Sequence, residues 1–237
     1  MQELISKVHP EWKEIVEKAL NVMDKDYLIA IQSAKTWLPG LDNLLNAFSL
    51  PLSKTNYILL GESPYPRPQS ANGYAFWDNA VGSLWSSNGL SKEVNRATSL
   101  RNWLKTLLVA RGDLNGDYSK EAIAKLNKSS YWQTAAEFFS SLMNKGFLLL
   151  NATLVYEEGK VQYHAKHWLP FMDKLLEELS QIKPEVELIL FGKIAEKIKK
   201  IDLFPCLIAE HPYNLSFITN KKVQAFFKPL DLLNRHV

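Results

Sequence analysis

Polar side chains directly follow three of the apolar runs in this sequence, and together they could form a reactive site. Glu62 and Ser63 follow the first run, Asn151 follows the second, and His211 stands just after the last. A carboxylate, a hydroxyl, an amide and an imidazole can exchange hydrogen bonds and move protons. Taken alone, each could be only a turn or capping residue. Side chains at the carboxyl ends of parallel strands share one edge of a sheet, where α/β proteins bind ligands, so their combination predicts a site.

Four short apolar runs predict the strands that would carry these groups, at residues 57–60, 147–150, 186–191 and 206–209. Unbroken apolar runs bounded by glycine or polar residues are typical of strands buried on both faces. Apolar residues at helical spacing predict helices at residues 11–25, 98–111, 131–144, 168–182, 193–200 and 220–234. This alternation predicts an α/β fold: one domain over residues 1–237, with three α/β/α layers and a central, mainly parallel four-stranded sheet.

The loop after the first strand is stiff and carries groups that could contact a ligand. Pro64, Pro66 and Pro68 exclude a regular helix or an interior strand there. The loop also carries Tyr65, and the glycine and aromatic residues of 73–77 follow it. A proline-rich surface connection is the simpler interpretation, but polar and aromatic groups crowded at a strand end favour a site. By contrast, residues 152–167 predict a polar and aromatic loop.

The composition sets limits on the class of protein. Apolar residues make up 46% and charged residues 22% of the 237 residues, which is typical of a folded globular protein. The net charge of +3 permits an anionic partner without requiring one. The single cysteine, Cys206, excludes an internal disulfide and any cysteine-based metal cluster. No apolar run could cross a membrane and the N-terminus is no signal peptide, so we expect a soluble cytoplasmic protein.

Five short motifs occur in order along the chain: GESPYP at 61–66, GYAF at 73–76, SLRN at 99–102, LLLN at 148–151 and HPYNLS at 211–216. Their order and spacing resemble the uracil-DNA glycosylase superfamily, most closely its family 1 branch. The corresponding segments of that family are Gly-Gln-Asp-Pro-Tyr-His, Gly-x-x-Phe, Ser-Leu-Lys-Asn, Leu-Leu-Leu-Asn and His-Pro-Ser-Pro-Leu-Ser. Each match is weak alone, but five in the correct order predict the fold and the superfamily.

The resemblance implies a monofunctional DNA glycosylase that flips out and excises uracil, or a related damaged base, by hydrolysing the N-glycosidic bond. Three residues would then bind the base. Phe76 would stack on it, Asn151 would hydrogen-bond its edge, and Tyr65 would exclude the 5-methyl group of thymine. His211 would donate a hydrogen bond to the base oxygen, where negative charge grows as the bond breaks.

The resemblance also implies a DNA-binding surface. Leu215 would fill the gap left by the flipped nucleotide, and Ser99, Arg101 and Ser216 would hold phosphates. The expected partner is DNA that contains uracil or another damaged base, bound by a monomer. No metal or cofactor is expected.

The sequence departs from the family pattern at the catalytic loop. Ser63 stands where the family has an aspartate that orients water and balances charge on the sugar, and serine carries no charge. Its hydroxyl could still position water. Glu62 supplies a carboxylate one position earlier, as in another branch, although neighbouring side chains leave the backbone in opposite directions. The catalytic candidates are therefore Ser63, Glu62 and His211. Pro66 replaces the family's histidine, and residues 213–214 are Tyr-Asn in place of Ser-Pro.

Two other functions remain open from the sequence. The serine at position 63 suggests a catalytically weak or inactive relative that binds DNA or a partner protein through the same surface. A hydrolase of a free nucleoside or nucleotide is the second alternative, and the apolar residue Leu215 argues against it.

Overall fold

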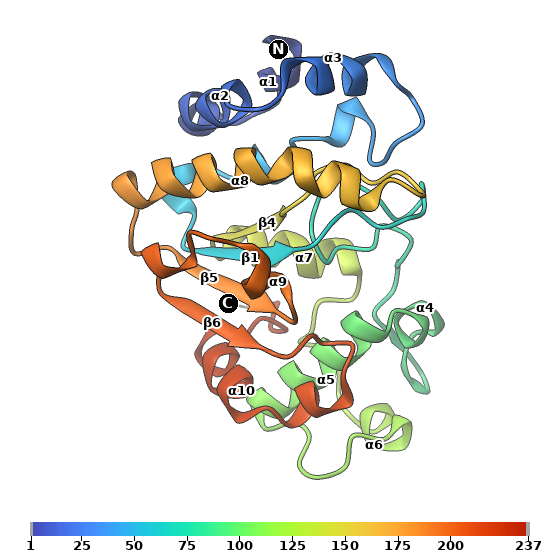
Figure 1. The fold of residues 1–237 in the computed structure, drawn as a ribbon. Helices are drawn as coiled ribbons and strands as arrows, with labels where there is room; N and C mark the ends of the chain where they lie inside the picture. The colour runs from blue at the N-terminus through green and yellow to red at the C-terminus, as the bar shows by residue number, and fades with distance from the viewer. Residues whose placement is uncertain (1, 236–237) are drawn as a thin grey trace.

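Residues 2–235 are described by a computed structural model, in which a parallel sheet lies between two layers of helices (Figure 1). The strands are β1 (Tyr57–Gly61), β4 (Phe147–Asn151), β5 (Glu187–Phe191) and β6 (Cys206–Ala209), in the order β4-β1-β5-β6. All three strand pairings are parallel. The predicted four-stranded α/β/α architecture is confirmed.

The sheet separates two apolar cores because successive side chains of a strand point to opposite faces. In β1, Ile58 and Leu60 pack into one core and Leu59 into the other. Leu148 and Leu149 of β4 divide between the two cores in the same way. Burial on both faces explains why these strands have no polar alternation in the sequence.

Helices from three regions of the chain cover the two faces. On one face lie α8 (Val161–Ile182) and, outside it, α2 (Lys13–Asn21) and α3 (Lys25–Ser33). The blue α2 and α3 lie above the orange α8 in Figure 1. Against the other face pack α5 (Thr98–Arg111), α7 (Ala135–Asn144) and α10 (Lys221–Phe227).

Shorter elements complete the described part of the chain. The short helices are α1 (Gln2–Ile5), α4 (Lys92–Arg96), α6 (Lys120–Ala124) and α9 (Ile194–Lys197), and a two-stranded antiparallel hairpin joins β2 (Trp85–Ser86) to β3 (Gly89–Leu90). The hairpin is absent from the sequence prediction. Within residues 2–235, no helix combines the length and the apolar character that crossing a membrane requires.

Several helix boundaries differ from the prediction. The helix expected at 131–144 begins only at Ala135, because Thr134 and Glu137 form a capping box there. The helix expected at 193–200 is limited to α9, and the last helix stops at Phe227, just before the 3₁₀ turn Lys228–Leu230, which contains a proline.

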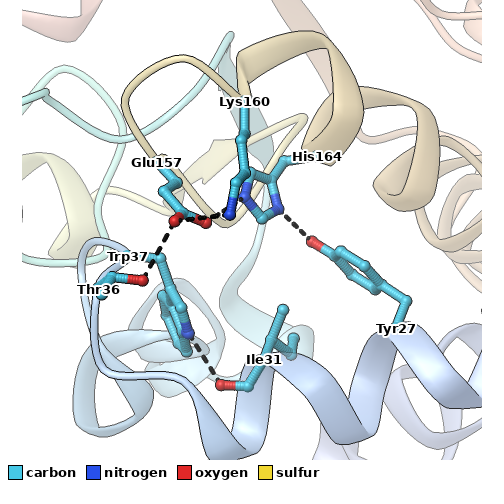
Figure 2. Close-up of polar contacts among 7 residues, drawn as sticks. All are labelled: Tyr27, Ile31, Thr36, Trp37, Glu157, Lys160 and His164. Carbon is cyan, nitrogen blue, oxygen red and sulfur yellow. Dashed lines mark hydrogen bonds and ion pairs between the residues drawn. The ribbon is translucent and has the colours of Figure 1, made fainter.

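The prediction of a loop at 152–167 is wrong for its second half, because residues 161–167 form the first turns of α8. Figure 2 shows that His164, in these first turns of α8, lies between Glu157 of the preceding loop and Tyr27 of α3. The Tyr27 hydroxyl is hydrogen-bonded to His164 Nδ1 at 2.8 Å, and His164 Nε2 lies 3.3 Å from the Glu157 carboxylate. Glu157 also pairs with Lys160 at 3.0 Å and accepts from Thr36 at 3.2 Å. These bonds attach α3 to α8.

Acid should therefore loosen the attachment of the N-terminal helices. Burial lowers the pKa of His164, although the Glu157 carboxylate partly opposes this, and His167 and Lys160 disfavour a further positive charge. Unfolded histidine titrates near about 6.5, so below that pH the unfolded chain binds the proton more readily than the folded chain. The free energy of unfolding should fall as the pH drops from about 7 toward 5. Urea unfolding of the parent and of His164→Gln, at both pH values, measures this contribution.

The variant should be less stable at pH 7 and should lose less stability on acidification, because glutamine does not titrate. An equal loss in both proteins would show that His164 does not cause the acid sensitivity.

Candidate active site

A pocket of about 260 Å³ lies at the carboxyl ends of β1 and β4. Side chains from distant parts of the sequence meet in it. Seven of the ten residues predicted for the site are in its lining: Glu62, Ser63, Tyr65, Phe76, Ser99, Asn151 and His211. The other three predicted residues, Arg101, Leu215 and Ser216, lie outside this lining. The site prediction therefore separates into a pocket and a surface around it.

Asn151 is the polar group on the floor of the pocket. It ends β4, is 2% exposed, and pairs in register with Gly61 of β1. None of the residues described here hydrogen-bonds its side-chain amide. A Cβ atom on Gly61 would collide with that amide and would lie 2.9 Å from the Cβ of Ala75. Glycine at this position thus leaves the space in which Asn151 can offer one donor and one acceptor to a ligand.

Phe76 forms an aromatic wall of the pocket, and an uncommon backbone conformation places it there. Its φ angle is +63°, in the left-handed region that non-glycine residues seldom adopt. The Tyr65 hydroxyl donates to the Phe76 carbonyl at 3.2 Å, and the pKa of Tyr65 is raised by burial, which keeps this donor protonated. Trp103 and Phe191 hold the Phe76 ring edge-on, with centroids 6.1 and 6.0 Å away.

His211 faces Phe76 across the pocket, with the two ring centroids 6.0 Å apart and the planes tilted by 25°. The backbone N–H of Tyr213 donates to His211 Nδ1 at 3.1 Å. Nδ1 is therefore an acceptor, which assigns the proton of the neutral ring to Nε2. Burial lowers the pKa of His211, while the nearby Glu62 carboxylate opposes the shift. At neutral pH the ring is uncharged and offers an Nε2–H donor.

Asn102 positions the loop that carries His211, a role that the sequence did not predict. Its side-chain N–H₂ group is buried in α5 and donates to the carbonyl of Pro212 at 2.8 Å, with longer contacts to Tyr213 at 3.3 Å and Asn214 at 3.4 Å. Asn102 lies on the opposite side of the helix predicted at 98–111 from its apolar residues, so nothing in the sequence signals that this amide is buried and needs partners.

Glu62 and Ser63 follow β1 in the pocket lining, where Glu62 is exposed and Ser63 is partly buried. Glu62 is the only acidic residue in the pocket lining, among the residues that the structure covers, and its Oε1 atom pairs with Lys197 of α9. No described residue hydrogen-bonds the Ser63 hydroxyl. The sequence did not predict the contact of Lys197 with Glu62, because a lysine-rich helix face is usually exposed to solvent. Lys197 also lines a second cavity of about 670 Å³ that shares Glu62 with the first.

The three predicted residues outside the pocket have different environments. The Arg101 guanidinium donates from Nε to Asn102 and from a terminal nitrogen to the carbonyl of Asn95, both at 3.2 Å. Leu215 is 71% exposed and Ser216 is also exposed, beyond the loop that Asn102 holds. Arg101 therefore joins α5 to α4 within the protein, whereas residues 215 and 216 are open to a partner.

The pocket is suited to a flat polar ring. Such a ring would lie against Phe76, exchange hydrogen bonds with Asn151, and receive a hydrogen bond from His211 at an electronegative atom. Across residues 2–235, no group of three or more histidine, cysteine, aspartate or glutamate side chains could hold a metal ion.

Known proteins share both the sequence pattern and the fold. The family model for the uracil DNA glycosylase superfamily matches residues 49–231. The uracil-DNA glycosylase of Wolinella succinogenes is 30% identical over 220 residues, which cover 89% of this chain and 83% of that protein.

Solved structures extend the likeness to three dimensions. The crystal structure of wild-type UNG from Nitratifractor salsuginis matches with a TM-score of 0.93 at 42% identity, over 98% of this chain and 96% of that chain. Mimivirus uracil-DNA glycosylase, at 17% identity and a TM-score of 0.57 over 88% of this chain and 71% of that one, shares the fold alone. Because the matched family region contains the whole sheet and every residue of the pocket, the chain belongs to the uracil-DNA glycosylase superfamily.

Proposed function

We propose that this protein is a monofunctional uracil-DNA glycosylase, which hydrolyses the bond between uracil and deoxyribose in DNA and leaves an abasic site. The observation that carries the proposal is the meeting of Asn151, Phe76 and His211 in one pocket. Together they offer the amide edge, the stacking surface and the neutral N–H donor that uracil requires. Membership of the superfamily supports the same activity.

The base is bound before the bond breaks. Uracil leaves the DNA stack and enters the pocket, where Phe76 stacks on it and the Asn151 amide accepts from its N–H and donates to its carbonyl. Tyr65, whose hydroxyl is held by the Phe76 carbonyl, forms part of the wall that excludes the 5-methyl group of thymine. The hydrogen bonds distinguish uracil from cytosine, and the wall distinguishes it from thymine.

The bond breaks as negative charge moves onto the base and positive charge onto the sugar. His211 Nε2–H donates a hydrogen bond to the base oxygen that gains charge. A neutral imidazole suits this role, because it stabilises the anion without giving up its proton. Water then forms a bond to the sugar carbon and gives up one proton, which neutralises the uracil anion, so neutral uracil leaves and a hydroxyl group stays on the sugar.

Ser63 and Glu62 divide the work that an aspartate performs in the family pattern. The Ser63 hydroxyl, which has no partner in the described chain, can hold the attacking water. Glu62 brings a negative charge to the pocket lining, where it stabilises the positive sugar, and its Oε2 atom remains available because Lys197 pairs with Oε1.

DNA is the partner in this proposal, and the enzyme acts on it as one domain and as a monomer. Leu215 fills the space left by the flipped nucleotide, while Ser99, Ser216 and Arg101 contact phosphates. Because Arg101 also donates to Asn102 and to Asn95 of α4, we expect it to act mainly by joining α4 to α5.

The decisive experiment is release of uracil from single-stranded and double-stranded oligonucleotides that contain one uracil. The purified protein should produce alkali-labile sites, and otherwise identical thymine oligonucleotides should stay intact. Asn151→Ala, purified in the same way, should be at least about 100-fold slower, because the base loses both polar contacts. This variant also controls for a contaminating glycosylase. Tight binding of uracil-containing DNA without any base release would instead support a binding protein.

The charge of Glu62 should matter more than the hydroxyl of Ser63. Glu62→Gln keeps the shape but removes the negative charge near the sugar, so the single-turnover rate should fall about 10- to 100-fold. The rate should fall less in Ser63→Ala. Adding Ser63→Asp to the Glu62→Gln variant should raise its rate by restoring a carboxylate. If Glu62→Gln retains the parental rate, the carboxylate has no part in catalysis.

The space above Gly61 should be essential to base binding. Gly61→Ala adds a methyl group against the Asn151 amide, and the amide must move away from the base. We expect a loss of about 100-fold in kcat/KM and a lower unfolding temperature, because the methyl group also crowds Ala75, so activity is compared well below the unfolding temperature of each protein. Gly82→Ala is the matched control, because nothing lies within 4 Å of its added methyl group. Equal activity in both variants would contradict the proposed position of Asn151 in catalysis.

A further inference from the structure

Two exposed apolar side chains stand together on the loop after β6. Tyr213 is 68% exposed and Leu215 is 71% exposed, more than any other large apolar side chain among the described residues. Isolated exposed apolar residues are ordinary on protein surfaces. Two of them on one short loop beside a ligand pocket are less ordinary. Leu215 has a place in the proposed function, whereas the ring of Tyr213 has none.

The loop holds Tyr213 in a fixed position although its side chain is exposed. The side-chain amide of Asn102 donates to the backbone carbonyls of Pro212, Tyr213 and Asn214, at 2.8 to 3.4 Å. The backbone N–H of Tyr213 is bonded to His211, and the N–H of Asn214 donates to the His211 carbonyl at 2.9 Å. No ring contact or side-chain hydrogen bond within residues 2–235 occupies the phenol of Tyr213.

The distance from His211 brings Tyr213 within reach of the strand that enters the pocket. Two residues of extended chain span at most about 7 Å, so Tyr213 lies close to the residue that contacts the flipped base. Neighbouring nucleotides of one strand are joined covalently, so the nucleotide beside a flipped one stays next to the mouth of the pocket. When one nucleotide occupies the pocket, the base beside it therefore falls within reach of a tyrosine side chain on this loop.

We propose that Tyr213 stacks on the nucleobase next to the flipped nucleotide. This inference rests on the proposed function and adds a second base-binding position to it. Every base has a flat π face, so the contact is independent of sequence, and base–aromatic stacking commonly contributes substantially to single-strand binding. Leu215 fills the gap in the stack, whereas Tyr213 holds the strand beside it. The contact is strongest on single strands, whose bases are free to turn toward the ring.

The test measures binding without turnover. The probe is a fluorescent single-stranded oligonucleotide with a tetrahydrofuran abasic unit at the target position, and its dissociation constant is measured by anisotropy. Tyr213→Ala should weaken binding about tenfold, within the range that loss of one stacked base gives. On a second oligonucleotide, in which both neighbours of the target are also abasic, the parent and Tyr213→Ala should bind equally.

Three comparisons separate stacking from other roles. Tyr213→Phe should restore binding, since it keeps the ring. Tyr163→Ala, which removes a tyrosine that is 49% exposed on α8, should bind like the parent. The dependence of affinity on salt should have the same slope in the parent and in Tyr213→Ala, because stacking releases no counterions. Unfolding temperatures of all variants identify any loss of structure.

Several results would overturn the inference. Equal binding by the parent and Tyr213→Ala on the first oligonucleotide would exclude a contact, and an equal loss on both oligonucleotides would exclude stacking on a neighbour. Failure of Tyr213→Phe would assign the effect to the hydroxyl. A parent that binds the probes with this pattern but releases no uracil would contradict the proposed activity and leave the stacking role supported.

Discussion

The site depends on one steric constraint: the register that places Gly61 of β1 opposite Asn151 of β4. A parallel sheet brings both strand ends to the same edge. The Asn151 amide fits there only because Gly61, opposite it, has no side chain. The buried runs before these residues fix that register, since a slip of one residue would exchange the side chains of the two cores. The sheet core and the polar pocket are therefore specified by the same contacts.

The second half of the site is built by a loop that has little regular structure of its own. Asn102, on a helix packed against the opposite face of the sheet from α8, holds the backbone of residues 212–214 through one amide group. The loop backbone in turn holds His211 through its Nδ1 atom and sets which ring nitrogen carries the proton. The chemistry of the imidazole thus depends on a buried amide that does not contact the base. A rigid loop also explains how exposed side chains can keep a defined direction.

The strands and the polar groups at their ends could be predicted because both are local signals in the sequence. A buried strand reads as an apolar run, and the residue after it must lie at the edge of the sheet. Helix boundaries were less accurate: the predicted loop at 152–167 hid the first turns of α8, whose polar residues bond to Tyr27 rather than to solvent. The contacts of Asn102 with Pro212, and of Lys197 with Glu62, could not be predicted. They join residues more than a hundred positions apart, and only tertiary packing determines such partners.

The backbone at Phe76 opposes local strain to side-chain packing. A side chain in the left-handed region costs about 1–2 kcal/mol relative to a conformation it prefers, and glycine would avoid most of that cost. Replacement by glycine would remove the ring and with it the wall of the pocket. The same replacement would also lose the edge-on packing of the ring against Trp103 and Phe191, and truncation of a well-packed phenylalanine costs about 3–5 kcal/mol. The packing of the ring thus offsets the strain of its backbone, so the side chain that forms the pocket wall also retains its own unusual conformation.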